Sequence, residues 1–164
     1  MGSPDDDQRP VQRAPAADVP TASLAARDPS HAIPALATHM GWVQAIGLDI
    51  QEVTPRLVVA QWDIDARHLQ PHGIVHGGVY ASVVETCCSV GALSAAAPGK
   101  LVVGVENHTS FLRPVRHGRL TARAVPLHAG RRAQLWECNI SDASGRLIAT
   151  GRLRVMCVEA EQNG

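Results

Sequence analysis

The segment from residue 77 to residue 98 contains a single charged side chain, Glu85. Small and apolar residues fill the rest of it, and they recur at every position around the helix that the segment predicts. Pro98 and Gly99 end this helix, which we expect over residues 77–97. A helix that is apolar nearly all round must be enclosed, so the rest of the chain has to supply a layer that surrounds it.

Strand patterns dominate the chain on both sides of this helix. Residues 57–65 alternate between apolar and polar side chains before it, and four further strands are expected after it, over residues 101–112, 118–127, 132–141 and 147–157. Asp142 to Gly145 form the turn between the last two. A strand pair, one helix and then about four strands with short connections predict an α+β fold, in which one antiparallel sheet wraps around a central helix.

The domain organisation follows from where the prolines lie. Six of the eleven prolines fall between Pro4 and Pro34, in a stretch without any period. We therefore expect a disordered tail over residues 1–34, a folded domain over residues 35–158 and a C-terminal tail over residues 159–164. A short helix is expected at about residues 33–40, and the chain after it, from near Gly41, forms the body of the fold.

Composition narrows the classes of partner. Lys and Arg together number 15, as do Asp and Glu, so no basic excess predicts binding to nucleic acid or to an anionic membrane. The first residues carry no apolar signal segment, and residues 77–97 are interrupted by Glu85, so we expect no membrane span and a cytoplasmic location. The four cysteines form no CxxC pair, which favours buried reduced thiols over a disulfide framework or a zinc ribbon.

Glu85 is the residue that the hydrophobic pattern does not explain. Burying an unpaired carboxylate costs several kcal/mol. Two interpretations are open from this residue alone. One is a chemical task, because unusual buried carboxylates gather at functional sites. The other is structural, with Glu85 paired to an arginine or facing a boundary between subunits.

Gly77 and Gly78 lie where a loop enters the helix. The first N–H groups of a helix lack internal partners and lie at the positive end of its dipole, and glycine lets a ligand approach them. This end is suited to a carbonyl oxygen that gains negative charge, although a plain Gly-Gly helix start is the simpler interpretation. Eight residues separate Gly77 from Glu85, which is roughly 12 Å along a helix. Either Glu85 acts through water or the site joins two subunits; we favour the second, which requires a dimer at least.

These residues resemble the hotdog-fold acyl-CoA thioesterase superfamily. Within it they are similar to the glutamate branch, which hydrolyses 4-hydroxybenzoyl-CoA and 1,4-dihydroxy-2-naphthoyl-CoA. The resemblance covers about residues 44–157 and is densest in QPHGIVHGGVYASVVETCCS and PLHAGRRAQLW. It implies a hotdog fold, hydrolysis of an acyl-CoA to the free acid and coenzyme A, and homotetramers built from dimers. It implies no cofactor, because coenzyme A is part of the substrate.

The resemblance also implies roles for individual residues. The amide of Gly77, which follows His76, would polarise the thioester carbonyl, and Gln70 would orient the thioester. Glu85 would act as nucleophile or general base, and Ser89 would position the attacking water or the carboxylate. The family places the glycine and the glutamate on different subunits, in line with the distance argument.

Two further regions match the family's substrate-binding positions. Asn107 and Phe111 lie on the strand that shapes the acyl pocket, and Phe111 stands where naphthoyl-type relatives often have histidine. The turn with Gly130, Arg131 and Arg132 resembles one that lines the coenzyme A channel. Its arginines would meet the nucleotide phosphates, or else remain solvated turn residues.

A metal hydrolase is the first rival interpretation. His68, His72 and His76 recur at a spacing of four residues. Pro71 and Gly73 lie between them, however, and argue against the helix that would align the three rings. We therefore predict no metal site.

Two other rivals remain. Cys87 or Cys88 would serve a cysteine nucleophile, but both lie in an apolar run without a suitably spaced base, so core packing is favoured. A hotdog module that binds acyl-CoA without cleaving it is the non-enzymatic alternative. The presence together of Gln70, Glu85 and Ser89 argues against it.

Overall fold

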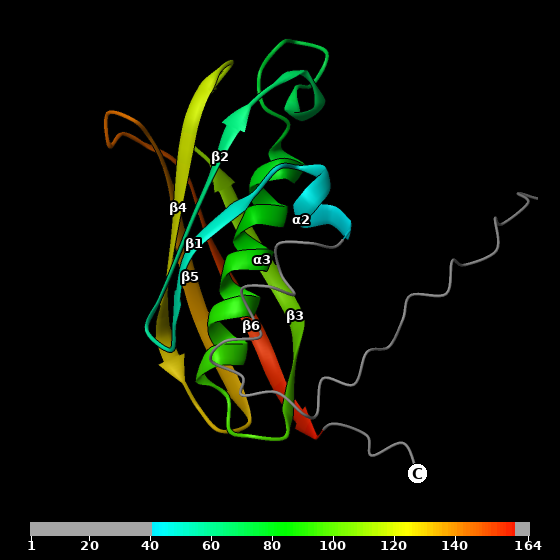
Figure 1. The fold of residues 1–164 in the computed structure, drawn as a ribbon, viewed down its shortest axis with the longest axis vertical. Coiled ribbons are helices and arrows are strands. Elements are labelled where there is room, and N and C mark those ends of the chain that lie inside the picture. Colours follow the sequence, from blue (N-terminus) through cyan, green and yellow to red (C-terminus); the bar gives the residue numbers. More distant parts are fainter. Residues whose placement is uncertain (1–40, 160–164) are drawn as a thin grey trace, which may run out of the picture.

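The computed structural model describes residues 41–159, and within that range six strands curl around one long helix (Figure 1). In chain order the elements are α2 (Gly41–Ala45), β1 (Asp49–Thr54), β2 (Leu57–Ile64), the 3-10 helix η2 (Ala66–His68), α3 (Gly77–Ala95), β3 (Lys100–Phe111), β4 (Gly118–Ala129), β5 (Ala133–Asp142) and β6 (Leu147–Glu159). The predicted architecture, one antiparallel sheet around a central helix, is confirmed.

The order of strands in the sheet is β1-β2-β4-β5-β6-β3, and every neighbouring pair is antiparallel. β3 follows α3 in sequence but lies at the far edge, beside β6. Bulges interrupt the register in β1, β3 and β4, where they bend the strands around the helix. β1 and β3 are therefore the two edges of the sheet within the described residues.

The core lies between the concave face of the sheet and α3. Alternate residues of β2, Val58, Ala60 and Trp62, are buried there, as the period of a half-buried strand requires. α3 comes so close to β5 that a Cβ on Gly91 would lie 2.5 Å from Cζ3 of Trp136. Gly91 thus lets the helix backbone rest against a large aromatic ring.

The predicted elements differ from the observed ones mainly at their ends. α3 stops at Ala95, two residues before the expected end, because Ala96 takes an extended conformation ahead of Pro98. The strands after α3 begin and end within two residues of the expected positions. The helix expected at about residues 33–40 and the N-terminal tail lie outside the described residues, as do residues 160–164.

The expectation that this chain encloses its helix on all sides is wrong. The sheet covers one side of α3, and Glu85 on the other side is exposed, with Ser82 and Ser89 half-buried beside it. β3 at the edge also exposes apolar side chains, including Val103 and Val105, the latter 54% exposed. α3 is long and apolar enough to cross a membrane, but half of it is buried against the sheet, as in a core helix.

Candidate functional site

His76 caps the N-terminus of α3. Its extended backbone (φ −66°, ψ 133°) turns the chain into the helix, and its Nδ1 accepts a hydrogen bond of 2.9 Å from the Gly78 amide. The Val79 amide donates to the His76 carbonyl. Within residues 41–159, no acceptor is found for the Gly77 N–H. An unpaired amide at the positive end of a helix dipole is a binding site for an oxygen with negative charge.

Phe111 covers one side of this amide. A Cβ on Gly77 would lie 2.5 Å from Cε2 of the Phe111 ring, so only glycine fits beneath the ring in its present position. The Tyr80 ring lies next to it, with the two ring centroids 6.1 Å apart. Burial raises the pKa of Tyr80 to about 12, and its hydroxyl has no hydrogen-bond partner among the described residues.

Gln70 lies in a tight loop that leads into His76. The Gln70 backbone N–H donates to the Ile74 carbonyl, and the Gln70 backbone carbonyl accepts from the Gly73 N–H, each at 2.8 Å. The His76 amide donates to the His68 carbonyl at the same distance. These bonds bring Gln70, His76 and Gly77 together at one end of the helix.

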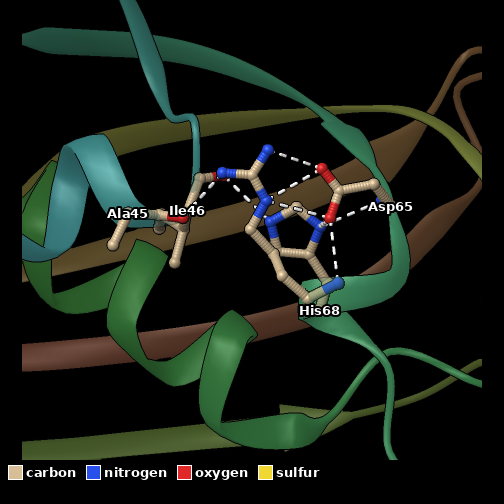
Figure 2. Close-up of polar contacts among 5 residues, drawn as sticks. Ala45, Ile46, Asp65 and His68 are labelled. Carbon is tan, nitrogen blue, oxygen red and sulfur yellow. Dashed lines mark hydrogen bonds and ion pairs between the residues drawn. The ribbon is translucent and has the colours of Figure 1, made fainter.

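His68 fixes the entrance to this loop (Figure 2). Its ring is fully buried; Nδ1 accepts from the Asp65 amide at 3.0 Å, and Nε2 lies 2.9 Å from the Ile46 carbonyl oxygen. This network assigns the ring proton to Nε2, which donates to Ile46. Arg67 reinforces the same contact, because it pairs with Asp65 and donates to the Ala45 carbonyl. The loop is thereby tied to the segment between α2 and β1.

The contacts of the His68 ring argue against the interpretation as a metal site. Both ring nitrogens of His68 are engaged by backbone groups, so the ring has no lone pair left for a metal ion. In the part of the chain that the structure describes, no group of three His, Cys, Asp or Glu side chains lies close enough together to bind one. His68, His72 and His76 do not form a ligand set.

Glu85 and Ser89 lie two and three turns further along α3. They share the exposed face of the helix, because residues four apart lie above one another. No hydrogen bond or ion pair of the Glu85 carboxylate is found among residues 41–159, and the expectation that it is buried within its own chain is wrong. About 12 Å of continuous helix separates Glu85 from Gly77. One chain therefore does not bring the acid and the amide onto the same small group.

Asn107 connects β3 to the start of α3. Its side-chain amide donates to the Ala81 carbonyl at 2.9 Å, and its carbonyl oxygen accepts from the Thr109 hydroxyl at 2.7 Å. Asn107, Thr109 and Phe111 all project toward the helix, since β3 alternates and His108 and Ser110 face the other way. The acyl-pocket candidates therefore flank the end of α3 that holds Gly77.

The turn with Gly130, Arg131 and Arg132 lies at the opposite end of α3, roughly 28 Å away along a helix of this length. The Gly130 amide donates to the Ala133 carbonyl, and a Cβ on Gly130 would lie 2.7 Å from that oxygen, which requires glycine there. Arg131 and Arg132 are exposed, and no ion pair of either is found among residues 41–159. A single chain does not bring this turn to Gly77.

The four cysteines are free and buried, which confirms the prediction of reduced core thiols. A hydrogen bond with Cys138, together with burial, raises the pKa of the Cys87 thiol well above its ordinary value. The same two causes raise the pKa of Cys88. Both thiols stay protonated and shielded, which argues against a cysteine nucleophile.

Most of the described part of the chain is similar in sequence and fold to known proteins. Residues 72–149 match the family model described as the thioesterase superfamily. The chain is 36% identical over 111 residues to the proofreading thioesterase EntH of Klebsiella pneumoniae, covering 68% of this chain and 81% of EntH. It is 32% identical over 116 residues to the 1,4-dihydroxy-2-naphthoyl-CoA hydrolase of Listeria monocytogenes, covering 71% of this chain and 94% of the relative. The crystal structure of S. sahachiroi AziG superposes with a TM-score of 0.72 at 40% identity, covering 74% of this chain and 98% of AziG.

Proposed function

Because this chain belongs to the thioesterase superfamily, we propose that it hydrolyses an acyl-CoA thioester to a free acid and coenzyme A, in a site that two copies share. The observation that carries the proposal is the pair of unpartnered groups on α3. Within the described residues, the Gly77 N–H has no acceptor and the Glu85 carboxylate has no donor. Thioester hydrolysis needs both kinds of group: a donor for the carbonyl oxygen and a carboxylate that activates water or attacks the carbonyl carbon.

The chemistry follows from these groups. The thioester carbonyl oxygen accepts a hydrogen bond from the Gly77 N–H, and this bond stabilises the negative charge that develops on the oxygen. Gln70 orients the thioester at the same end of α3. Glu85 either takes a proton from the attacking water or attacks the carbonyl carbon itself to form an anhydride that water then cleaves. The C–S bond breaks in both routes, and coenzyme A leaves as the thiolate. Ser89 holds the water or the carboxylate.

A second copy of the chain would bring a Glu85 carboxylate close to the Gly77 N–H. β3 is a 12-residue edge strand, and among residues 41–159 no strand pairs with its outer row of backbone donors and acceptors. Pairing of two copies along β3 would cover its exposed apolar residues and the open face of α3. A two-fold contact would face Glu85 of each copy toward Gly77 of the other, which creates two equivalent sites.

Other features extend the proposal. Arg131 and Arg132, exposed on their turn, would meet the nucleotide phosphates of coenzyme A. Leu101 and Val103 pair with Val158 and Met156 on the outer face of the sheet, and this apolar patch would join two dimers into a tetramer. We further propose a cytoplasmic location and no separate cofactor.

The first test is turnover of a panel of aromatic, short-chain and long-chain acyl-CoAs, measured by release of the free thiol. Glu85→Gln should lower kcat by about 10²–10⁴ with little change in KM. Glu52→Gln, an exposed glutamate on β1, is the matched control and should keep full activity. Retained activity in Glu85→Gln would rule out the assignment. Tight binding of acyl-CoA without turnover by the unmodified chain would instead favour the non-catalytic binding module.

A mixing experiment tests whether the site is shared. Gly77→Pro removes the N–H, while proline suits the first position of a helix and the extended His76 that precedes it. Its added Cβ also displaces the Phe111 ring of the same chain, which affects only the site that the variant already disables. Gly77→Pro and Glu85→Gln should each be inactive alone. Co-refolded in equal amounts, they should recover about one quarter of the wild-type rate, because half of the dimers are mixed and each has one intact site. No recovery would mean that each site lies within one chain.

A further inference from the structure

The connection between β3 and β4 packs against the loop that leads into α3. The Val75 amide donates to the Val115 carbonyl at 2.8 Å, which joins the two segments through the backbone. Nη1 of Arg116 donates to two successive carbonyls of the loop, those of His72 and Gly73, each at 3.1 Å. A Cβ added to Gly73 would also lie 3.1 Å from this nitrogen, so the guanidinium rests directly over the Gly73 backbone.

The loop needs such a partner. Two neighbouring carbonyls that converge on one point repel each other unless a donor, best a charged one, lies between them. Gly73 has a φ of +71°, a conformation that glycine adopts readily, and its amide closes the turn back to Gln70. Without Arg116, the peptide group between His72 and Gly73 keeps, among the described residues, only the hydrogen bond from its N–H to the Gln70 carbonyl, and the turn that carries Gln70 loosens.

We propose that Arg116 is a positioning residue for the thioesterase site: it holds the loop of residues 70–76 so that Gln70 and the Gly77 amide keep their places around the thioester. This inference builds on the proposed function and adds a residue to it from a different part of the chain. Arg116 lies 43 residues beyond Gly73, and no spacing or motif in the sequence connects the two.

The position of Arg116 predicts which kinetic constant changes. Gln70 and the Gly77 amide act on the thioester as charge develops, and small displacements of such groups chiefly slow the chemical step. A loosened loop should therefore lower kcat and leave KM nearly unchanged. An arginine that instead bound a phosphate of coenzyme A would show its loss in KM.

Arg113 provides a matched control. It belongs to the same connection and is exposed like Arg116, but its guanidinium donates to the Leu147 carbonyl of β6 and not to the loop. Arg116→Met removes the charge and the donors while it keeps an unbranched side chain, and Arg116→Lys restores a charged donor. Because Arg116 lies on the surface, both variants should fold.

The experiment measures thiol release and amide hydrogen exchange for each variant. Arg116→Met should lower kcat about tenfold, with KM within about twofold, and should speed exchange at the amides of Gly73 and Val75. Arg116→Lys should recover most of kcat. Arg113→Met should match the wild type in both measurements.

Several results would overturn the inference. They are an unchanged kcat or unchanged exchange in Arg116→Met, a rise in KM at constant kcat, or an equal loss in Arg113→Met. The Glu85→Gln variant separates this failure from that of the proposed function. Its loop exchange should equal that of the wild type, and retained turnover in it would reject the catalytic assignment whatever Arg116→Met does.

Discussion

The two faces of α3 differ in their surroundings and in their side chains. The packed face, with Val84, Cys87 and Cys88, is fully buried against the sheet. The open face carries Ser82, Glu85 and Ser89, half-buried or exposed in the single chain. Both faces belong to one helix whose neighbours in sequence are almost all small or apolar. The sheet covers the face with the apolar side chains and leaves uncovered the face with the hydroxyls and the carboxylate.

The comparison teaches where to look for chemistry on an apolar helix. On the packed face, side chains are fixed by shape, because protein interiors are close-packed and little room remains. On the open face, the Glu85 carboxylate has no partner among residues 41–159 and stays available to a substrate or a second copy. Changes on the packed face should therefore alter stability, and changes on the open face should alter activity.

Gly91→Ala should have the largest effect on stability. The added methyl would lie 2.5 Å from Cζ3 and 2.7 Å from Cη2 of the buried Trp136 ring. Overpacking of this kind typically costs about 1–3 kcal/mol, which exceeds the gain in helix propensity from glycine to alanine. Urea denaturation of the variant measures the loss.

Trp136→Phe provides the second arm of this test, since it removes the ring atoms that meet the new methyl group. In the double variant, the cost of Gly91→Ala should shrink by at least about 1 kcal/mol relative to its cost in the wild type. Equal costs in both backgrounds would show that the packed face tolerates the extra volume, and the contrast between the two faces would fail.

The open face should respond in the opposite way. Ser89→Ala should lower kcat by about tenfold, because Ser89 lies one turn beyond Glu85 and is proposed to hold the water or the carboxylate. Its free energy of unfolding should change by less than about 0.5 kcal/mol, as for most surface substitutions. Thiol release and urea denaturation of the same preparation give both values.

Ser94→Ala is the matched control for this change. Ser94 lies on the same helix, and its hydroxyl donates to the Gly91 carbonyl at 2.8 Å, far from Glu85. Its loss should leave kcat unaltered. A Ser89→Ala variant that is unstable yet fully active would place Ser89 on the structural side of the comparison.

Local patterns in the sequence were enough to predict the fold. The alternation in β2 and β6 and the apolar run of α3 identify these elements because each pattern reports which side chains are buried. The sequence left β1 without residue-level limits, since Asp49, Gln51 and Glu52 break the apolar alternation. The prediction that α3 is enclosed was wrong for residues 41–159, because a run of small and apolar residues does not show which side of a helix its own sheet will cover.

The site divides in the same way. Gly77 and Glu85 stand out in the sequence. A glycine pair begins the helix, and a single carboxylate lies in the middle of its apolar run. Which of the proposed site residues take part in catalysis stays a prediction. The contacts of His68 and Arg116 had no signal, because they join segments 22 and more than 40 residues apart through single side chains.

Tyr80 is the polar exception near the packed face, and Tyr80→Phe should have the smallest effect of the series. Its hydroxyl is buried without a partner among the described residues, so its removal should stabilise the fold by about 1 kcal/mol.

Burial also raises the pKa of Tyr80 from 10.0 to about 12, so the folded state holds the proton more tightly than the unfolded chain does. The contribution of Tyr80 to stability should therefore be fully present below pH 10 and be lost as the pH rises toward about 12. Tyr80→Phe should lose less stability over this range, and its remaining fall comes from other groups such as the buried thiols of Cys87 and Cys88, whose pKa values folding also raises. Tyr80 is the one tyrosine of the chain, so the tyrosinate absorbance reports it alone. A folded-state titration near pH 10, or a loss of stability in Tyr80→Phe, would mean that water or a second copy satisfies the hydroxyl and that the packed face ends before Tyr80.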